Sequence, residues 1–352
     1  MRVLVTGACG FVMSVFIRCF LRDHEEARVL ALDVGEPDEA WSGHLAEVAG
    51  RVDFERCDVR DRDRVATLLA RHRPETVVHG ATVTLVPEWE REDPGRFLDV
   101  NVMGTAAVLD AARRAGSVGR VVHVSSAAVY GAGDPGRTEP QDEDTPLDPD
   151  EMYGVSKVAA ELVARRFAAL YGISVPIVRC TKVFGPMERP TSSRALMSLP
   201  YHLARALVAG TPLTVTPRTL RAAGDWISAV DVAAALGLLC TRPDVGSVAF
   251  NLAGGVSVPV PRLAELFGVE LAADGERAVA DADPALRSGK DGTYSVRRAA
   301  RLLGWRPRDL PRQVDEYREW ALAHWSPQNH GDPADHRDPA SDRAPGKPGT
   351  PA

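Results

Sequence analysis

Short apolar runs alternate along the first half of the chain with longer segments whose apolar residues recur every three to four positions. The first pattern is typical of strands buried on both faces, and the second of helices with one buried face. Strands are predicted at residues 2–6, 28–33, 52–57, 76–80, 120–125 and 175–180. Helices are predicted after the first strand through about residue 21, and at 62–73, 97–115 and 153–171. This alternation predicts an α/β fold with a doubly wound parallel sheet of six strands.

The pattern changes after about residue 181. Residues 185–200 are rich in Pro, Ser and Arg and are predicted to form a long loop. Shorter elements follow, with helices predicted at 201–209, 230–239 and 260–267 and strands at 213–215, 226–228 and 249–252. Because ligands bind at the carboxyl edge of open α/β sheets, we expect residues 181–325 to form a smaller α/β substrate-binding region over a cofactor-binding domain of residues 1–180. The Pro- and Asp-rich residues 326–352 are predicted to be disordered.

The composition narrows the class of protein. Of the 352 residues, 45% are hydrophobic and 26% charged, and the net charge of −6 speaks against a nucleic-acid or anionic-membrane partner. Five widely spaced cysteines without a C-x-x-C pair predict a reducing compartment and no zinc site, and the histidines show no metal-ligand spacing. No apolar run is long enough for a bilayer, and the chain enters a strand at once. We therefore expect a cytoplasmic protein with no membrane segment, signal peptide or bound metal.

Residues 6–11, TGACGF, join the first strand to the first helix. Gly7 permits a tight turn, and Gly10 lets the backbone approach a pyrophosphate at the positive end of the helix. Where a third glycine stands in such turns, this chain has Met13. The position of the motif, at the end of the first strand, favours a dinucleotide-binding turn over an ordinary one.

Two carboxylates follow the next strands. Asp33 ends the second strand, where a carboxylate accepts hydrogen bonds from ribose hydroxyls and repels a 2′-phosphate. No arginine stands in residues 34–40 to bind that phosphate, so NAD is favoured over NADP. Asp58, after the third strand, is placed to reach the adenine amino group.

A candidate catalytic group comes from the second half of the predicted sheet. Ser126 stands at the end of the fifth strand, and Tyr153 and Lys157 follow on one face of a predicted helix, four positions apart. An ammonium beside a phenol favours the phenolate and lowers the tyrosine pKa, so Tyr153 is expected to act as a base. Ser126 is expected to orient the substrate alcohol. These groups suit the removal of a proton from a secondary alcohol while a hydride leaves its carbon.

These motifs together resemble the extended short-chain dehydrogenases/reductases, the NAD-dependent sugar epimerases and dehydratases. The resemblance covers roughly residues 1–323, and it includes VTGACGF, CDVRD, VVHGAT, VSSAAVYG, YGVSK, VFGP, GDWISAVDV, FNLAGG and LLGWRP. It implies a Rossmann domain and an enzyme that acts on a secondary hydroxyl of a sugar or sugar nucleotide. It also implies a homodimer held by a four-helix bundle from helices 97–115 and 153–171.

The resemblance implies particular contacts. The catalytic residues are Ser126, Tyr153 and Lys157, and the expected NAD contacts are Gly7, Gly10, Phe11, Asp33, Asp58, Val59, Gly80, Ala81, Asn101, Tyr153 and Lys157. The expected substrate contacts are Thr82, Ser125, Ser126, Lys182, Arg189, Arg194 and Arg221, with Arg287 as a further source of positive charge.

The chain departs from the family pattern around the substrate. Ala127 and Ala128 follow Ser126, where 4,6-dehydratases carry acids, so dehydration is not expected. Lys182 and Gly224 stand where many members have Asn and Arg that help to hold a nucleotide diphosphate. Three interpretations remain open. The first is an epimerase that acts through a transient keto intermediate. The second is a dehydrogenase of a sugar, sugar acid or polyol, and the third is a non-catalytic NAD-binding protein.

Overall fold

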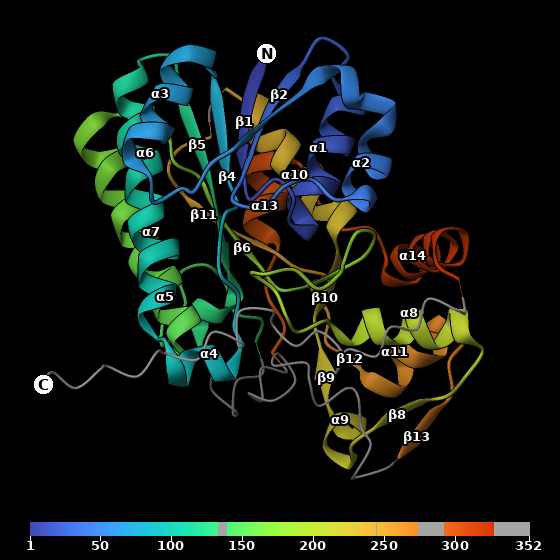
Figure 1. Cartoon of the computed structure of the whole chain (residues 1–352). Coiled ribbons are helices and arrows are strands. Elements are labelled where there is room, and N and C mark those ends of the chain that lie inside the picture. The colour runs from blue at the N-terminus through green and yellow to red at the C-terminus, as the bar shows by residue number, and fades with distance from the viewer. Residues whose placement is uncertain (133–138, 244, 274–291, 327–352) are drawn as a thin grey trace, which may run out of the picture.

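A parallel sheet of seven strands forms the centre of the molecule (Figure 1). The structure is a computed structural model that describes residues 1–132, 139–243, 245–273 and 292–326. The spatial order is β11-β6-β5-β4-β1-β2-β3. The strands are β1 (Arg2–Thr6), β2 (Arg28–Asp33), β3 (Val52–Arg56), β4 (Thr76–His79), β5 (Arg120–Ser126), β6 (Ile177–Cys180) and β11 (Ala249–Leu252). Because the order reverses between β1 and β4, a crevice opens there at the carboxyl ends of the strands.

Helices cover both faces of this sheet (Figure 1). One face carries α1 (Phe11–Asp23), α2 (Glu39–Leu45), α10 (Ala229–Thr241) and α13 (Arg297–Leu303), and the other carries α3 (Arg62–His72), α6 (Thr105–Ala115) and α7 (Met152–Tyr171). Two short 3-10 helices lie beside these elements: η1 (Ala46–Arg51) packs on α1 and α2, and η3 (Ala127–Tyr130) follows β5 and packs on α7. The strands other than the edge strand β3 are almost entirely buried, because both faces are packed. The doubly wound fold that the sequence predicts is confirmed.

The sheet has one strand more than the six that the pattern predicts. β11 pairs in parallel with β6, from Ala249 opposite Ile177 to Leu252 opposite Cys180, and α10 packs on α1. Both elements come from the part of the chain that we expected to belong mainly to the smaller region. The apolar run at 249–252 was correctly predicted as a strand, but a single strand carries no mark of which sheet it will join.

The predicted helix at 97–115 is continuous, but its first half is π-helical rather than α-helical, and other helices precede it. The structure has α4 (Pro87–Glu92), the single turn α5 (Gly95–Phe97), a π-helical segment η2 (Leu98–Gly104), and then α6. The widened turn of η2 contains Asn101, which is 1% exposed and hydrogen-bonds to the backbone of Val83. π-Helical turns are frequent at functional sites, and a long-range bond of this kind leaves no periodic signal in the sequence.

The smaller region lies below the carboxyl edge of the sheet in Figure 1. It contains three two-stranded pairs, β7–β10, β8–β13 and β9–β12. Its strands are β7 (Lys182–Phe184), β8 (Leu213–Val215), β9 (Ala223–Gly224), β10 (Trp226–Ser228), β12 (Val258–Pro259) and β13 (Leu271–Ala273), and its helices are α8 (Leu199–Ala209), α9 (Pro217–Arg221), α11 (Val260–Phe267) and α14 (Leu310–His324). They bury a core of their own around Phe184, Trp226, Phe267 and Tyr317.

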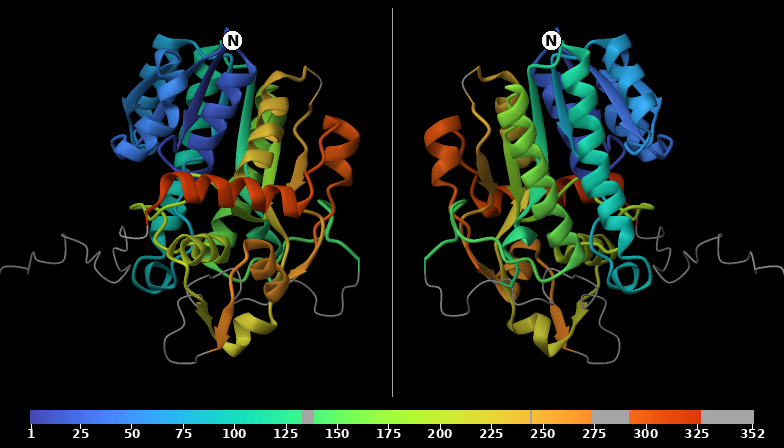
Figure 2. Two further views of the ribbon diagram at one scale, coloured as in Figure 1. Left: turned by 90° about the vertical axis from the view of Figure 1, so that its right-hand side faces the viewer. Right: turned by 90° about the vertical axis from the view of Figure 1, so that its left-hand side faces the viewer.

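The helix α14 lies between the central sheet and the smaller region. Figure 2 shows it lying across the molecule between the sheet and the smaller region, where it packs on α8, α11 and β10. Gln313 of α14 accepts a hydrogen bond from the backbone N–H of Ser228, at the end of β10. Within the described ranges, every helix is too short or too polar to cross a membrane. The predicted disordered tail lies outside the described residues apart from Ser326, and so does Arg287.

Candidate active site

A cleft of about 1400 Å³ runs along the carboxyl ends of the strands from β2 to β6. The glycine turn, the ends of β2 and β4, the serine strand, the start of α7 and residues 190–198 line it. The cleft therefore brings the expected cofactor turn and the expected catalytic side chains to one space. Most of the predicted contacts lie on its wall: Gly7, Gly10, Phe11, Asp33, Asp58, Val59, Gly80, Ala81, Thr82, Ser125, Ser126, Tyr153, Lys157, Lys182 and Arg194.

The glycine turn is built for close approach. Gly7 has φ +68°, and a Cβ there would lie 2.8 Å from the backbone N of Ala81. A Cβ at Gly10 would lie 2.9 Å from the carbonyl oxygen of Gly7. Gly10 caps α1 without a side-chain hydrogen bond, so the first N–H groups of the helix are left for a ligand. This arrangement fits an anion such as a pyrophosphate.

Met13 fills space that Gly80 leaves open. The Met13 side chain is 3% exposed, and its Sδ lies 2.5 Å from the position that a Cβ on Gly80 would take. Any larger residue at position 80 therefore collides with the methionine unless one of them moves. The flexible thioether adapts to the gap at the end of β4. Met13 is thus a packing partner of Gly80 within the wall of the cleft.

Asp33 is held in place by the backbone. Its two carboxylate oxygens accept hydrogen bonds from the N–H of Cys9, at 2.9 Å, and of Gly35, at 3.0 Å. Burial raises the pKa of Asp33, and these hydrogen bonds oppose that rise. Asp58 instead pairs with Arg60 at 2.6 Å, and this hydrogen-bonded ion pair lowers the pKa of Asp58. Both carboxylates face the cleft, as an adenosine site requires.

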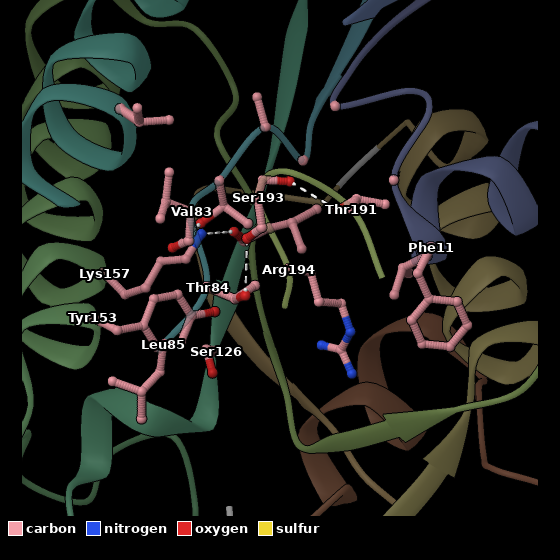
Figure 3. Close-up of a pocket in the computed structure, with 18 of the residues that line it drawn as sticks. Phe11, Val83, Thr84, Leu85, Ser126, Tyr153, Lys157, Thr191, Ser193 and Arg194 are labelled. Carbon is pink, nitrogen blue, oxygen red and sulfur yellow. Dashed lines mark hydrogen bonds between the residues drawn. The ribbon is translucent and has the colours of Figure 1, made fainter. Parts of the chain in front are cut away.

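The three catalytic candidates converge from two elements (Figure 3). Tyr153 and Lys157 project from α7, and Ser126 lies at the end of β5, with Phe11 and Arg194 across the cleft. The Lys157 Nζ donates to the Val124 carbonyl oxygen at 2.9 Å and lies 5.8 Å from the centre of the Tyr153 ring. Ser126 accepts a hydrogen bond from the Ala128 N–H at 3.1 Å, which caps η3.

Burial dominates the proton affinities of this group. It raises the pKa of Tyr153 to about 12, although a hydrogen bond with Ser126 and the charge of Arg194 act in the opposite direction. It lowers the pKa of Lys157 to about 8. The expectation that the lysine lowers the tyrosine pKa is therefore wrong for the protein alone, because desolvation of the phenolate is the larger effect. The pKa of Lys157 therefore lies only slightly above neutral pH.

Asn101 lies off the wall of the cleft, contrary to its expected place among the cofactor contacts. Its amide oxygen accepts from the Val83 N–H at 2.8 Å and from the Thr82 hydroxyl at 3.0 Å. Its amide nitrogen donates to the Ser156 hydroxyl at 2.9 Å and to the Val83 carbonyl oxygen at 3.1 Å. All four polar contacts that its side chain makes here are internal. Asn101 fixes the segment after β4 against α7, and that segment carries Thr82 to the cleft.

The arginines separate into two groups. Arg194 reaches the cleft, held by the buried Glu188 at 2.5 Å. Arg189 and Arg221 do not line it. Arg189 instead pairs with Asp38 at 2.8 Å and donates to the carbonyl oxygen of Cys9 at 3.2 Å. Among the described parts of the chain, no group of three His, Cys, Asp or Glu side chains is placed to hold a metal ion.

Lys182 and Gly224, the two residues that differ from the family's Asn and Arg, lie against each other. A Cβ on Gly224 would lie 3.0 Å from the Cδ of Lys182, so the lysine stem uses the room that the glycine leaves. Lys182 and Trp226 are partners across the β7–β10 pair. The residues that stand in place of the family's Asn and Arg are therefore one packed unit, and Lys182 lines the cleft.

The family is decided by comparison with known proteins. Residues 3–253 match the NAD dependent epimerase/dehydratase family. The chain belongs to this family. It is 32% identical to a dTDP-glucose 4,6-dehydratase of Streptomyces antibioticus, over 93% of this chain and 95% of that protein. It is 31% identical to a UDP-glucose 4-epimerase of Mycolicibacterium smegmatis, over 87% of this chain and 94% of that protein.

A solved structure of similar form is MoeE5 in complex with UDP-glucuronic acid and NAD. It is 28% identical, with a TM-score of 0.75 over 92% of this chain and 100% of that chain. As a member of the NAD dependent epimerase/dehydratase family, this chain is an NAD-dependent enzyme, which excludes the non-catalytic interpretation. The open glycine turn and the anchored Asp33 fit that dinucleotide.

The sequence did not predict that the loop at residues 185–198 is bonded to the segment after β4. The Thr84 N–H and hydroxyl both donate to the carbonyl oxygen of Ser193, at 3.1 and 3.0 Å. Figure 3 shows both residues between the catalytic group and Arg194. We call residues 185–198 the strap, because Ser193 joins it to the segment after β4 and Arg189 joins it to the glycine turn. No local pattern marks either contact, because the partners lie more than a hundred positions apart.

Proposed function

We propose that this enzyme is an epimerase that inverts a secondary hydroxyl of a nucleotide-linked sugar. The observation that carries the proposal is the convergence of Ser126, Tyr153 and Lys157 in the cleft that also holds the glycine turn and Asp33. The relatives include both an epimerase and a dehydratase. The wall beyond Ser126 separates the two reactions.

The protein residues handle the proton. NAD, when bound, accepts a hydride from the substrate carbon and returns it. Tyr153 takes the hydroxyl proton while Ser126 holds the same oxygen, and the positive charge of Lys157 stabilises the phenolate that Tyr153 must become. Once the substrate is a ketone, rotation of the sugar presents its other face. Tyr153 then returns the proton to the oxygen.

The two residues after Ser126 offer no acidic side chain that could assist dehydration. Ala127 and Ala128 follow Ser126 and line the cleft with methyl groups, which donate no proton to a departing hydroxyl. This favours epimerisation over 4,6-dehydration, although the chain is similar to dehydratases.

The strap favours a cofactor that stays bound. Arg189 ties it to Asp38 and Cys9 beside the dinucleotide turn, and Ser193 ties it to Thr84. An epimerase returns its hydride in each cycle and needs no exchange of NAD, whereas a dehydrogenase must release NADH. A strap fastened on both sides of the cleft suits the first.

Arg194 is proposed as the contact for an anionic part of the substrate. Its guanidinium reaches the cleft opposite Tyr153, and its anchor Glu188 is 1% exposed. Lys182 and Thr82 line the cleft as further proposed contacts, with Ser125 behind Ser126. Arg189, whose carboxylate partner is Asp38, acts in this proposal through the strap.

We also propose that the enzyme is a cytoplasmic homodimer. All five cysteines are free, as in a reducing compartment. Four large apolar side chains, Leu98, Met103, Val155 and Leu162, are exposed on η2 and α7, which pack against each other. A second copy placed against these helices would bury them in a four-helix bundle.

Product analysis tests the activity. The protein is incubated with NAD and, separately, with UDP-glucose, UDP-glucuronic acid and dTDP-glucose, and the products are followed by NMR, mass spectrometry and NADH absorbance. We expect a new stereoisomer of unchanged mass with no net NADH. Tyr153→Phe is expected to lower kcat by about 10²–10⁴-fold, because the proton acceptor is lost, with NAD affinity nearly unchanged.

Other outcomes would replace the proposal. Stoichiometric NADH identifies a dehydrogenase, and a product lighter by one water identifies a dehydratase. A Tyr153→Phe variant as active as the wild type would sink the proposed chemistry.

A further inference from the structure

Beneath the catalytic side chains, a buried ion pair joins α7 to β6. The Glu161 and Arg179 side chains are each 1% exposed. The guanidinium holds the carboxylate in two places, with Nε to Oε1 at 2.9 Å and Nη2 to Oε2 at 2.7 Å. A buried pair with this geometry costs desolvation, so it is weak support for stability as such. Its position next to the catalytic side chains points instead to a role in the active site.

Glu161 contacts the backbone neighbour of one catalytic residue and shares a helix face with another. The Ser125 hydroxyl donates to Glu161 Oε1 at 2.7 Å, and Ser125 directly precedes Ser126. Lys157 precedes Glu161 by four positions, on the same buried face of α7. One carboxylate therefore connects the serine strand to the lysine helix.

Hydrogen bonds extend from this ion pair to β11 of the central sheet. Arg179 Nη1 donates to the Tyr130 hydroxyl at 2.8 Å, and that hydroxyl donates to Asn251 Oδ1 at 2.7 Å. Asn251 Nδ2 donates to the Gln141 carbonyl oxygen at 3.1 Å. Arg179 also precedes Cys180, which lines the cleft. The ends of β5, β6 and β11 are thus held in one polar network.

Glu161 is also the anion that faces Lys157. The described groups that act electrostatically on this lysine, or lie against it, come from four elements: Tyr153 and Glu161 on α7, Cys180 on β6, His79 on β4 and His123 on β5. Burial raises the pKa values of Tyr153 and Cys180 to about 12, lowers that of His79 to about 3, and lowers that of His123 well below its usual range. These four are neutral near pH 7. Two arginines lie near the same carboxylate: Arg179 pairs with it at 2.7 Å, and the half-exposed Arg165 lies 3.6 Å from it.

We propose that Glu161 is a positioning residue of the active site: it holds Ser126 in place through Ser125 and keeps the Lys157 amine in its charged form. This inference rests on the proposed function for its consequence, because both groups serve the proton transfer. Glu161 does not line the cleft and touches no reacting atom. Its effect passes through the two residues that do.

The composition of the chain permits a direct test. It contains four lysines, Lys157, Lys182, Lys290 and Lys347. Protein made with ¹³C-labelled lysine therefore gives few signals, and Lys157→Arg identifies the one of interest. Its chemical shift is followed against pH in the full-length protein without substrate. Burial lowers the pKa of Lys157 to about 8 while Glu161 raises it, so the wild-type midpoint is expected near 8.

Glu161→Gln removes the charge and keeps the shape. We expect the Lys157 midpoint to move to lower pH, because the ammonium loses its anion, and the alkaline limb of kcat/KM to move with it. Glu161→Asp is expected to restore part of the shift. The matched control is Glu265→Gln, which removes an exposed carboxylate in an ion pair with Arg262 and should leave the midpoint unchanged. An equal midpoint in the wild type and in Glu161→Gln overturns the proposal.

A second variant covers a failure of Glu161→Gln to fold. Ser125→Ala breaks the hydrogen bond from the serine strand to the carboxylate, and it is expected to lower kcat about tenfold or more with KM little changed. An unchanged kcat overturns the proposal in that case. The lysine titration needs no substrate, so it still reports on Glu161 if none of the nucleotide sugars is turned over, a result that would count against the proposed function alone.

Discussion

Met13 fits beside the glycine turn because Gly80, which lies opposite it, has no side chain. Its Sδ lies 2.5 Å from the place of a Cβ on Gly80, so the two positions are matched in size. A third glycine in such turns normally lets the helix lie close to the sheet. Here α1 still packs with Met13 buried, because the room comes from β4. Lys182 and Gly224 are matched in size in the same way, because the lysine side chain occupies space that Gly224 leaves open.

Gly80→Ala tests the match between positions 13 and 80. The added methyl group collides with Met13, and we expect a loss of about 1–3 kcal/mol in the free energy of unfolding, together with weaker NAD binding. In a Met13→Ala background the same change is expected to cost much less, because the obstructing thioether is gone. Thermal unfolding and calorimetric titration with NAD measure both effects.

Gly50→Ala is the control for this pair, because nothing lies within 4 Å of its Cβ position. It should leave both measurements unchanged. Additive effects of Met13→Ala and Gly80→Ala would show that the two residues are not coupled.

At the scale of elements, the strap decides how the cleft is covered. Its residues have no regular secondary structure over most of their length, so contacts hold it. Arg189 contributes the contacts nearest the dinucleotide turn, with Asp38 and the Cys9 carbonyl oxygen. Its side chain is 18% exposed and that of Asp38 is 50% exposed, so solvent weakens the ion pair.

Arg189→Ala is expected to let NAD leave faster. A partly exposed pair of this kind is worth up to about 1 kcal/mol, which corresponds to an acceleration of roughly fivefold. Release of NAD from preloaded protein, measured by exchange against labelled NAD, tests this. Arg262→Ala, which breaks an exposed pair on α11, serves as the control. Equal release rates in the wild type and in Arg189→Ala would show that the strap does not retain the cofactor.

At the scale of the whole molecule, the helices η2 and α7 carry exposed large apolar side chains. Leu162 is 62% exposed on α7, and Val155 lies on the same helix seven positions earlier. Leu98 and Met103 extend this surface onto η2. Exposed apolar side chains that gather on one face mark interaction sites, and we propose that a second copy covers these four.

Leu162→Glu is expected to convert the proposed dimer into a monomer, because it places a charge at the most exposed of these apolar side chains. Light scattering on a sizing column should then give the chain mass of 37.9 kDa in place of twice that value. Leu322→Glu, an equally exposed leucine on α14 at 56%, is the matched control and should remain dimeric. A wild-type protein that elutes as a monomer would rule out the proposed bundle.

Local patterns along the chain were enough for the first six strands of the sheet, for several of the helices and for the family, although α2, α13 and α14 were not predicted. The strand at 2–6, the turn with Gly7 and Gly10, and the four-residue spacing of Tyr153 and Lys157 each depend on residues close in sequence, and all of them are present as expected. The helix at 260–267 also has the predicted bounds. Such features follow from backbone preference and side-chain periodicity, which a sequence displays directly.

Folding decided whatever depends on distant partners. Gly80 makes room for Met13, Asp38 takes Arg189 away from the cleft, Asn101 turns inward to Val83, and β11 completes the sheet. The same holds for Glu161, whose carboxylate bonds to Ser125, 36 positions earlier. A side chain carries its chemistry in the sequence, but its partner is chosen by packing. The kinds of residues that make this site were therefore readable from the chain, whereas their division between catalysis, positioning and structural support came only from the tertiary fold.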